Sequence, residues 1–252
     1  MKKLGYILTL SVAMAVAAVT MAKAQILTSV NFQGGDTGTL APVDMTGATG
    51  YVGGNWNNET GTSGGPLVLN DSSGFTSDVT LTSFAAGPFG VNGPDTDNSS
   101  AQKTLFGGSL GVNFGPATFT ISGLSAYSSY DLVVYYTGGT SFADSRDANI
   151  TASGSSLTYY VAGDNSAYTS FDLSNSTDSS TFASGNYVVF SGLTAATETV
   201  AMNYVNNNMG LVGFQVTGYE ESAPVPEPST WALMLGGLAL LVGVQRLRRV
   251  RS

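Results

Sequence analysis

Leu132-Val133-Val134-Tyr135-Tyr136 is the stretch that decides the fold class, because it places five large apolar or aromatic side chains in a row. Valine and tyrosine are strong strand formers. Successive side chains of a strand point to opposite faces of a sheet, so this segment has no polar face. It therefore predicts a strand that is buried on both sides and lies centrally in the core.

Three further segments, 117–121, 200–204 and 212–216, place apolar side chains at every second position, as strands with one buried face do. Helical periodicity is hard to find in the body of the chain, whereas short β-branched runs between Gly, Asn, Asp and Ser recur. About ten or eleven strands at this spacing predict an all-β fold, a two-sheet jelly-roll-like β-sandwich. The additional expected strands are 26–32, 66–69, 78–84, 103–106, 157–161, 168–173 and 186–190. The Gly-rich stretch 34–65 is long for a compact domain, and a functional loop and a merely mobile one both explain it.

Residues 1–24 have the parts of a secretory signal peptide helix: a basic start, an apolar run over 4–21 and small residues before a cleavage point. The residues that define the expected cleavage site are Ala22, Ala24 and Gln25, the last being the first of the mature chain. An uncleaved N-terminal anchor is the alternative. The apolar run is barely membrane length, however, and a cleavage-type site follows it at once.

The body, residues 25–219, suits a single extracellular β-sandwich domain, followed by a short polar linker at 220–224. Over 25–224 only Lys103 and Arg146 stand against sixteen Asp and Glu, which gives a net charge of −14. Such a charge repels phosphate backbones, so we expect no nucleic-acid partner. It is suited to attracting cations, or to keeping the domain soluble by self-repulsion.

Neither cysteine nor histidine occurs in the sequence, and this narrows the available chemistry. Without cysteine there are no disulfides, thiolate nucleophiles or Cys-ligated metals. Without histidine there is no Ser-His-Asp relay and no His-ligated zinc or iron. A pair of carboxylates can still hydrolyse a glycosidic bond, but the Asp residues fall at turn-like positions and no pair stands out. We therefore expect a protein that is not an enzyme.

The C-terminal segment 225–252 combines a proline-flanked motif, an apolar stretch and a basic end. The prolines keep the chain extended just before residues 231–244, which predict a single transmembrane helix. These fourteen residues span about 21 Å of a hydrocarbon core of about 30 Å, so snorkelling arginines and local thinning must cover the difference. The basic end stays cytoplasmic and leaves the acidic domain outside. Its arginines are Arg246, Arg248, Arg249 and Arg251.

The succession of Val-Pro-Glu-Pro, an apolar stretch containing Gly-Gly-Leu and an Arg-rich end resembles the PEP-CTERM sorting signal of Gram-negative bacteria. The resemblance covers 225–252 and implies recognition by an exosortase, a membrane-embedded transpeptidase-like enzyme. It implies that Pro226, Glu227 and Pro228 are the recognition residues and that the arginines form the stop-transfer cluster. Members of this family usually accompany exopolysaccharide or biofilm production. An ordinary single-span tail anchor with an incidental proline pair is the alternative.

In the body, the segments GLSAYSSYDLVVYY, GNYVVFSGL and MGLVGFQVTGYE are similar to strands of galactose-binding-like jelly rolls, which occur in many PEP-CTERM proteins. This resemblance is architectural and transfers no site residue. The whole sequence predicts a cell-surface or extracellular-matrix protein that crosses the inner membrane, is transiently anchored by its tail and associates with exopolysaccharide. A carbohydrate-binding module is the first alternative, and a polysaccharide-active enzyme is the second.

Two candidate binding sites lie in the body. The loop after residue 93 places Asp95, Asp97 and Asn98 at near-alternate positions, which makes them candidate ligands for Ca²⁺. The full EF-hand pattern is missing, and Asp and Asn stabilise turns for backbone reasons alone. The acidic positions with the same ambiguity are Asp144, Asp147, Asp164 and Asp178.

Exposed aromatic rings are the second candidate, because they can stack on sugars. Trp56 is the leading candidate, since it is the only Trp of the body and lies in a polar stretch of Gly and Asn. A lone large aromatic residue usually fills a core, so packing is the alternative. The other aromatic candidates are Tyr51, Tyr127, Tyr159, Tyr160 and Tyr168.

Overall fold

The computed structural model describes the greater part of the body of the chain. The described residues are 25–33, 39–59, 66–82, 88–90, 100–111, 115–138, 146–163, 170–206 and 209–220. One compact unit comprises Ala24–Glu221, and a second comprises Met1–Lys23 with Ser222–Ser252. The second unit lies wholly outside the described residues, so the signal peptide and the C-terminal helix are not described. None of the helices in the described part of the chain is long and apolar enough to cross a bilayer.

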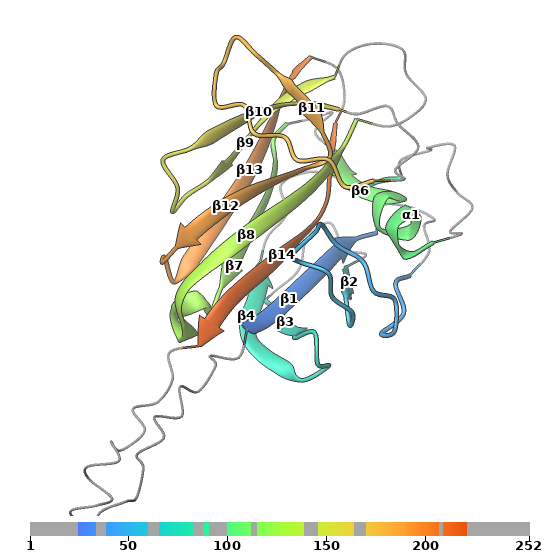
Figure 1. Ribbon diagram of the computed structural model, residues 1–252, viewed down its shortest axis with the longest axis vertical. Coiled ribbons are helices and arrows are strands. Elements are labelled where there is room, and N and C mark those ends of the chain that lie inside the picture. The colour runs from blue at the N-terminus through green and yellow to red at the C-terminus, as the bar shows by residue number, and fades with distance from the viewer. Residues whose placement is uncertain are drawn as a thin grey trace, which may run out of the picture. The chain divides into compact units, whose positions relative to one another are not determined.

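Two seven-stranded sheets lie one behind the other (Figure 1). Sheet I has the order β12 (Tyr187–Leu193), β8 (Tyr127–Thr137), β14 (Gly210–Glu220), β1 (Gln25–Phe32) and β2 (Asn57–Glu59); β6 (Gly108–Gly111) pairs with both β14 and β5 (Pro88–Gly90). Sheet II has the order β11 (Ala183–Gly185), β10 (Thr158–Gly163), β9 (Asp147–Ala152), β13 (Thr197–Asn206), β7 (Ala117–Ser122), β4 (Thr76–Thr82) and β3 (Leu67–Asn70). All pairs are antiparallel except β1 with β2 and β10 with β11.

Strand β8 lies between β12 and β14, and its central segment is buried on both faces, as the sequence predicts. Leu132, Val134 and Tyr136 belong to the inner core between the two sheets. Val133 and Tyr135 point the other way, into a second apolar group on the outer face of sheet I, here called the outer cluster. The outer cluster explains why this strand lacks a polar side.

Residues 39–59 and helix α1 (Ala101–Phe106) supply the cover over that outer face. Leu40, Ala48 and Trp56 come from the former, and Leu105 and Phe106 come from the latter. From the sequence alone, the Gly-rich stretch 34–65 had two explanations, a functional loop and a mobile one. The described part of this stretch, 39–59, is instead a layer packed on sheet I.

The all-β, two-sheet prediction is confirmed, and its four best strands appear as β8, β7, β13 and β14. The prediction of a strand at 103–106 is wrong, because these residues are the last four of α1. Ser100 caps that helix: its Oγ accepts a hydrogen bond from the Lys103 N–H at 3.3 Å, which stabilises the first turn.

The expected strand at 168–173 is absent from its described part, where only Leu173 makes an isolated bridge, to Tyr187. Five strands were not predicted from the sequence. Four of them have only three or four residues and so offer too few alternating positions, whereas β9 does alternate, with Ala148, Ile150 and Ala152 buried, and could have been predicted. These strands are β2, β5, β6, β9 and β11.

Candidate functional site

The first and last strands of the domain begin and end side by side in sheet I (Figure 1). Gln25 pairs with Tyr219, and Glu220 pairs with Tyr127 at the start of β8. Gln25 is thus both the first residue of β1 and the expected first residue of the mature chain. The chain segments before residue 25 and after residue 220 are consequently joined to the same end of the domain.

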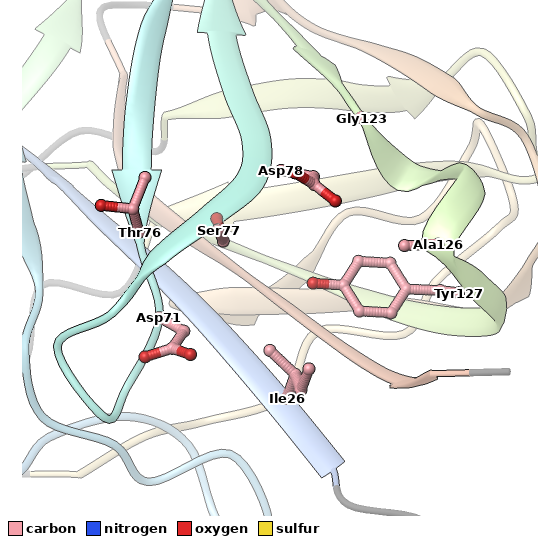
Figure 2. A pocket seen from close by; sticks show the side chains of 8 residues that line it. All are labelled: Ile26, Asp71, Thr76, Ser77, Asp78, Gly123, Ala126 and Tyr127. Carbon is pink, nitrogen blue, oxygen red and sulfur yellow. The ribbon is translucent and has the colours of Figure 1, made fainter. Parts of the chain in front are cut away.

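A polar hollow of about 140 Å³ lies at this end of the domain (Figure 2). It is lined by Ile26 from β1, by Asp71, Thr76, Ser77 and Asp78 from the β3–β4 hairpin, and by Gly123, Ala126 and Tyr127 from the corner between β7 and β8. Figure 2 shows the Tyr127 hydroxyl pointing into the space between the two carboxylates. The hollow is smaller than the roughly 300–1,000 Å³ usual for small-molecule sites.

The turn between β3 and β4 already engages one of these carboxylates. Asp71 Oδ1 accepts hydrogen bonds from the backbone N–H groups of Ser73 at 2.8 Å and Phe75 at 3.0 Å. Asp71 therefore acts as a turn residue, in the way Asp commonly does. The other carboxylate oxygen of Asp71, and the carboxylate of Asp78, are ligands of the type that hard cations prefer. Within the described residues, however, no group of three or more His, Cys, Asp or Glu side chains is close enough to hold a metal ion.

Trp56 lies in the outer cluster with only 4% of its surface exposed. Its ring centroid lies 6.1 Å from that of Tyr135, and its indole N–H donates a hydrogen bond to the Gly53 carbonyl at 3.0 Å. A ring packed in this way offers almost no face to a sugar. The burial favours the packing alternative for Trp56 over glycan binding.

Tyr51 covers the outer face of sheet I and is held by a carboxylate of β8. Its hydroxyl donates a hydrogen bond to Asp131 Oδ2 at 3.1 Å, and Asp131 Oδ1 accepts the Gly192 N–H at 3.0 Å. Burial, followed by the negative charge of Asp131 and the hydrogen bond to it, raises the pKa of Tyr51 to about 12. This aromatic candidate joins three segments of the fold.

The other aromatic candidates have different surroundings. Tyr127 lines the polar hollow. Tyr159 packs on Phe190 in the inner core and donates its hydroxyl to the Val189 carbonyl at 2.7 Å. Tyr160 is half-buried beside Phe182, with 5.8 Å between the ring centroids. Tyr168 lies outside the described residues.

The acidic candidates are not brought together by the described structure. Asp95, Asp97, Asn98, Asp144 and Asp164 lie outside the described residues. Asp147 begins β9. Asp178 forms a turn, because its Oδ1 accepts hydrogen bonds from the backbone N–H and the hydroxyl of Ser180 at 2.9 and 2.8 Å. The same bonds lower the pKa of Asp178. The turn explanation therefore fits Asp178.

Glu198 is a buried carboxylate that the sequence pattern did not single out. It lies at 0% exposure in β13 and on the same face as Val200 and Met202, which belong to the inner core. Its oxygens accept hydrogen bonds from Tyr130, Ser153 and Gly154. The alternation along β13 was the signal that could have placed this carboxylate inside the domain.

A second buried polar network crosses the outer cluster. The Ala48 N–H donates to the Tyr135 hydroxyl at 2.9 Å, the same hydroxyl donates to Gln215 Oε1, and Gln215 Nε2 donates to Ser29 Oγ at 2.9 Å. Burial raises the pKa of Tyr135. This chain of hydrogen bonds ties the covering segment to three strands of sheet I.

The fold and the paired chain ends define a class: a two-sheet β-sandwich whose first and last strands pair with each other in one sheet. Comparison with protein families then finds the PEP-CTERM protein-sorting motif at residues 224–249. The match includes Pro226, Glu227 and Pro228 and extends through Arg249, so Arg251 lies just beyond it. No curated protein and no solved structure matches the chain.

The motif supports exosortase-dependent sorting of an exported protein. It implies that the chain is anchored for a time and is then processed. The residues that carry this function are in the tail, outside the described residues, while the β-sandwich is the part that the tail delivers.

Proposed function

We propose that the protein is a non-enzymatic component of the cell surface or extracellular matrix, which an exosortase processes and places in contact with exopolysaccharide. The observation that carries the proposal is the sorting motif at residues 224–249. In this proposal the signal peptide 1–24 directs export, the helix 231–244 anchors the chain for a time, and the four C-terminal arginines stay in the cytoplasm.

Two properties of the body support this assignment. The net charge of −14 over 25–224, from two basic and sixteen acidic residues, favours solubility outside the cell. The first and last strands, β1 and β14, pair with each other in sheet I, so the chain enters and leaves the sandwich at neighbouring positions. A jelly-roll relationship to galactose-binding-like domains belongs to the proposal as well, and rests on the two-sheet architecture alone.

A matched pair of substitutions tests the sorting function. Glu227→Ala changes the centre of the Pro-Glu-Pro motif, whereas Glu221→Ala removes the same carboxylate just upstream of the matched residues. In a host that contains an exosortase, mass spectrometry of the mature protein should find Gln25 at its start and no sequence beyond about Pro228 for the natural chain and for Glu221→Ala. Glu227→Ala should retain Ser252 and stay in the membrane fraction.

Processing of Glu227→Ala to the same product as the natural chain would count against recognition of the motif. Retention of Ser252 by the natural chain, in a host shown to process another substrate, would count against processing altogether. A carbohydrate-binding module without matrix placement would instead be indicated by full glycan binding with no dependence on an exosortase.

A further inference from the structure

Among the described residues, nothing covers the outer face of sheet II in the way that residues 39–59 and α1 cover that of sheet I. In β7 and β13 every second residue points into the inner core, and those between point outward. Thr197, Thr199 and Asn203 are exposed, while Thr120 and Ser122 are half-buried beside them. No described segment packs over these side chains as residues 39–59 pack over sheet I.

Side-chain hydrogen bonds organise this surface into rows across the strands. Thr120 Oγ1 and Thr199 Oγ1 are 3.1 Å apart, and the Thr197 hydroxyl donates to Ser122 Oγ at 3.4 Å. These two pairs are directly opposite in the β13–β7 register. The contacts restrict the rotamers and so reduce the entropy that a ligand would have to remove. Each hydroxyl still has unused capacity to donate or accept.

Farther across the same surface, on β13, β9 and β10, the outward side chains carry amides and aromatic rings in place of hydroxyls. Asn203 Nδ2 donates to Asn149 Oδ1 at 3.1 Å, and the backbone register places Asn149 opposite Tyr160. The Tyr160 ring packs on Phe182 at the margin of the sheet. We call the surface formed by Thr120, Ser122, Thr197, Thr199, Asn149 and Asn203 the hydroxyl-amide face.

The hydroxyl-amide face carries no charge, although the body of the chain holds sixteen acidic residues. The nearest carboxylates on the outward side of sheet II each lie one outward position beyond the face. Asp147 is two residues from Asn149 in β9, and Asp78 is two residues from Thr80, which pairs with Ser122. A surface without charge attracts neither polyanions nor polycations, so it suits an uncharged partner. The acidic remainder of the domain opposes close approach of a second copy or of an anionic polymer.

The spacing of the face matches an extended polymer better than a small ligand. Neighbouring strands lie about 4.8 Å apart, and outward side chains repeat about every 6.6 Å along a strand, so the polar groups form a regular lattice. Each hydroxyl and amide both donates and accepts hydrogen bonds, as the hydroxyls of a sugar do. Rings at the margin add an apolar surface on which a sugar ring can stack.

We propose that the hydroxyl-amide face binds a neutral, hydroxyl-rich polysaccharide. The inference deepens the proposed function and rests on it in one respect: export brings the face into contact with extracellular polymers. The hydroxyl-amide face is a different part of the molecule from Trp56, which is buried in the outer cluster on sheet I.

Binding of the full-length protein, held in a detergent without a sugar headgroup, tests the proposal. The probes are neutral glucans, mannans and galactans, with alginate as an anionic polymer and chitosan as a cationic one. We expect binding to at least one neutral polymer, and an affinity that changes less than about twofold between low and high salt because no charge pair is involved. Binding to none of the neutral polymers would overturn the proposal.

A double substitution locates the binding to the face. Thr120→Val with Thr199→Val removes two hydroxyls, keeps side-chain shape and preserves β-propensity. Loss of two neutral hydrogen bonds should weaken binding about tenfold. Thr194→Val, an exposed threonine outside the face, is the control and should bind as the natural chain does.

Equal binding by the double variant and the control would place the glycan elsewhere and refute the face. Concentration-dependent self-association that the double variant abolishes, without glycan binding, would identify the face as an interface between copies instead. Neither result depends on processing of the tail, so the face and the sorting function can fail separately.

Discussion

At the scale of single residues, the buried carboxylate of Glu198 places an unusual demand on the fold. Its Oε1 accepts a hydrogen bond from the Tyr130 hydroxyl at 3.0 Å, and its Oε2 accepts from Ser153 Oγ at 3.0 Å and the Gly154 N–H at 2.7 Å. A carboxylate without water around it must find such partners. Here they come from β8 and from the turn between β9 and β10, so the side chain fastens that turn to the core.

Glu198→Leu should lower the free energy of unfolding by about 2–4 kcal/mol, because it removes the acceptor of three hydrogen bonds, two of which fasten the turn between β9 and β10 to the core. Glu198→Gln is the matched control. Its amide oxygen can still accept from Ser153 and Gly154, and its NH₂ can donate to the Tyr130 hydroxyl, so a loss of about 1 kcal/mol is expected. Urea unfolding followed by tryptophan fluorescence measures both; equal stability of Glu198→Leu and the natural chain would refute this role.

At the scale of elements, two glycines with positive φ differ in what an added side chain would meet. A side chain at either position would strain the backbone, but only at Gly123 would it also collide with another strand. Gly123 has φ +82° at the corner between β7 and η1 (Leu124–Ala126), and a Cβ added there would collide with the backbone carbonyl oxygen of Asp78. Gly192 has φ +70° in β12, where an added Cβ would meet nothing within 4 Å. The first glycine lets the corner approach β4, while the second serves only the local backbone conformation.

Gly192→Ala should therefore lower the free energy of unfolding by about 1–2 kcal/mol, because the only penalty is that of alanine in the left-handed conformation. Gly123→Ala should lower the free energy of unfolding by more than about 3 kcal/mol, because β4 or the corner between β7 and η1 has to move as well. Denaturant unfolding of the two variants gives the difference directly. A smaller loss for Gly123→Ala than for Gly192→Ala would mean that the corner and β4 are not held in contact.

The strands β7, β8, β13 and β14 could be predicted from the sequence, whereas the helix α1 could not. β8 was predictable because Leu132 to Tyr136 leave no polar face, and alternation alone revealed β7, β13 and β14. α1 was not, because Lys103 to Phe106 read equally well as a short strand until the cap from Ser100 is seen. A six-residue helix that completes the outer cluster depends on what it packs against, which a local pattern does not contain.

The candidate sites divide in the same way. The Pro226-Glu227-Pro228 motif could be predicted because its information is linear: three residues, an apolar stretch and arginines in a fixed order. The burial of Trp56 could not, since it follows from the packing of residues 39–59 on sheet I. The hydroxyl-amide face needed the strand register, because Thr120 and Thr199 are neighbours only across β7 and β13.

At the scale of the whole molecule, the first and last strands of the β-sandwich pair with each other, so the sorting tail continues from a strand inside sheet I. β14 lies between β1 and β8, and every strand that it pairs with belongs to the same compact unit, which spans Ala24–Glu221. Tail processing near Pro228 would therefore cut the chain beyond the last hydrogen-bonded residue of the sheet. Such an arrangement lets a membrane enzyme release the domain without opening its core.

Removal of residues 221–252 should consequently leave the free energy of unfolding of the sandwich within about 0.5 kcal/mol of that of the full-length chain, because no β14 pairing is lost. A chain ending at Met209 is the contrast, since it lacks β14 and separates β1 from β8; it should not fold. Thermal unfolding in one non-glycosidic detergent compares all three chains. A marked loss of stability in the chain ending at Glu220 would show that the sorting tail supports the domain, and processing would then weaken the protein that it releases.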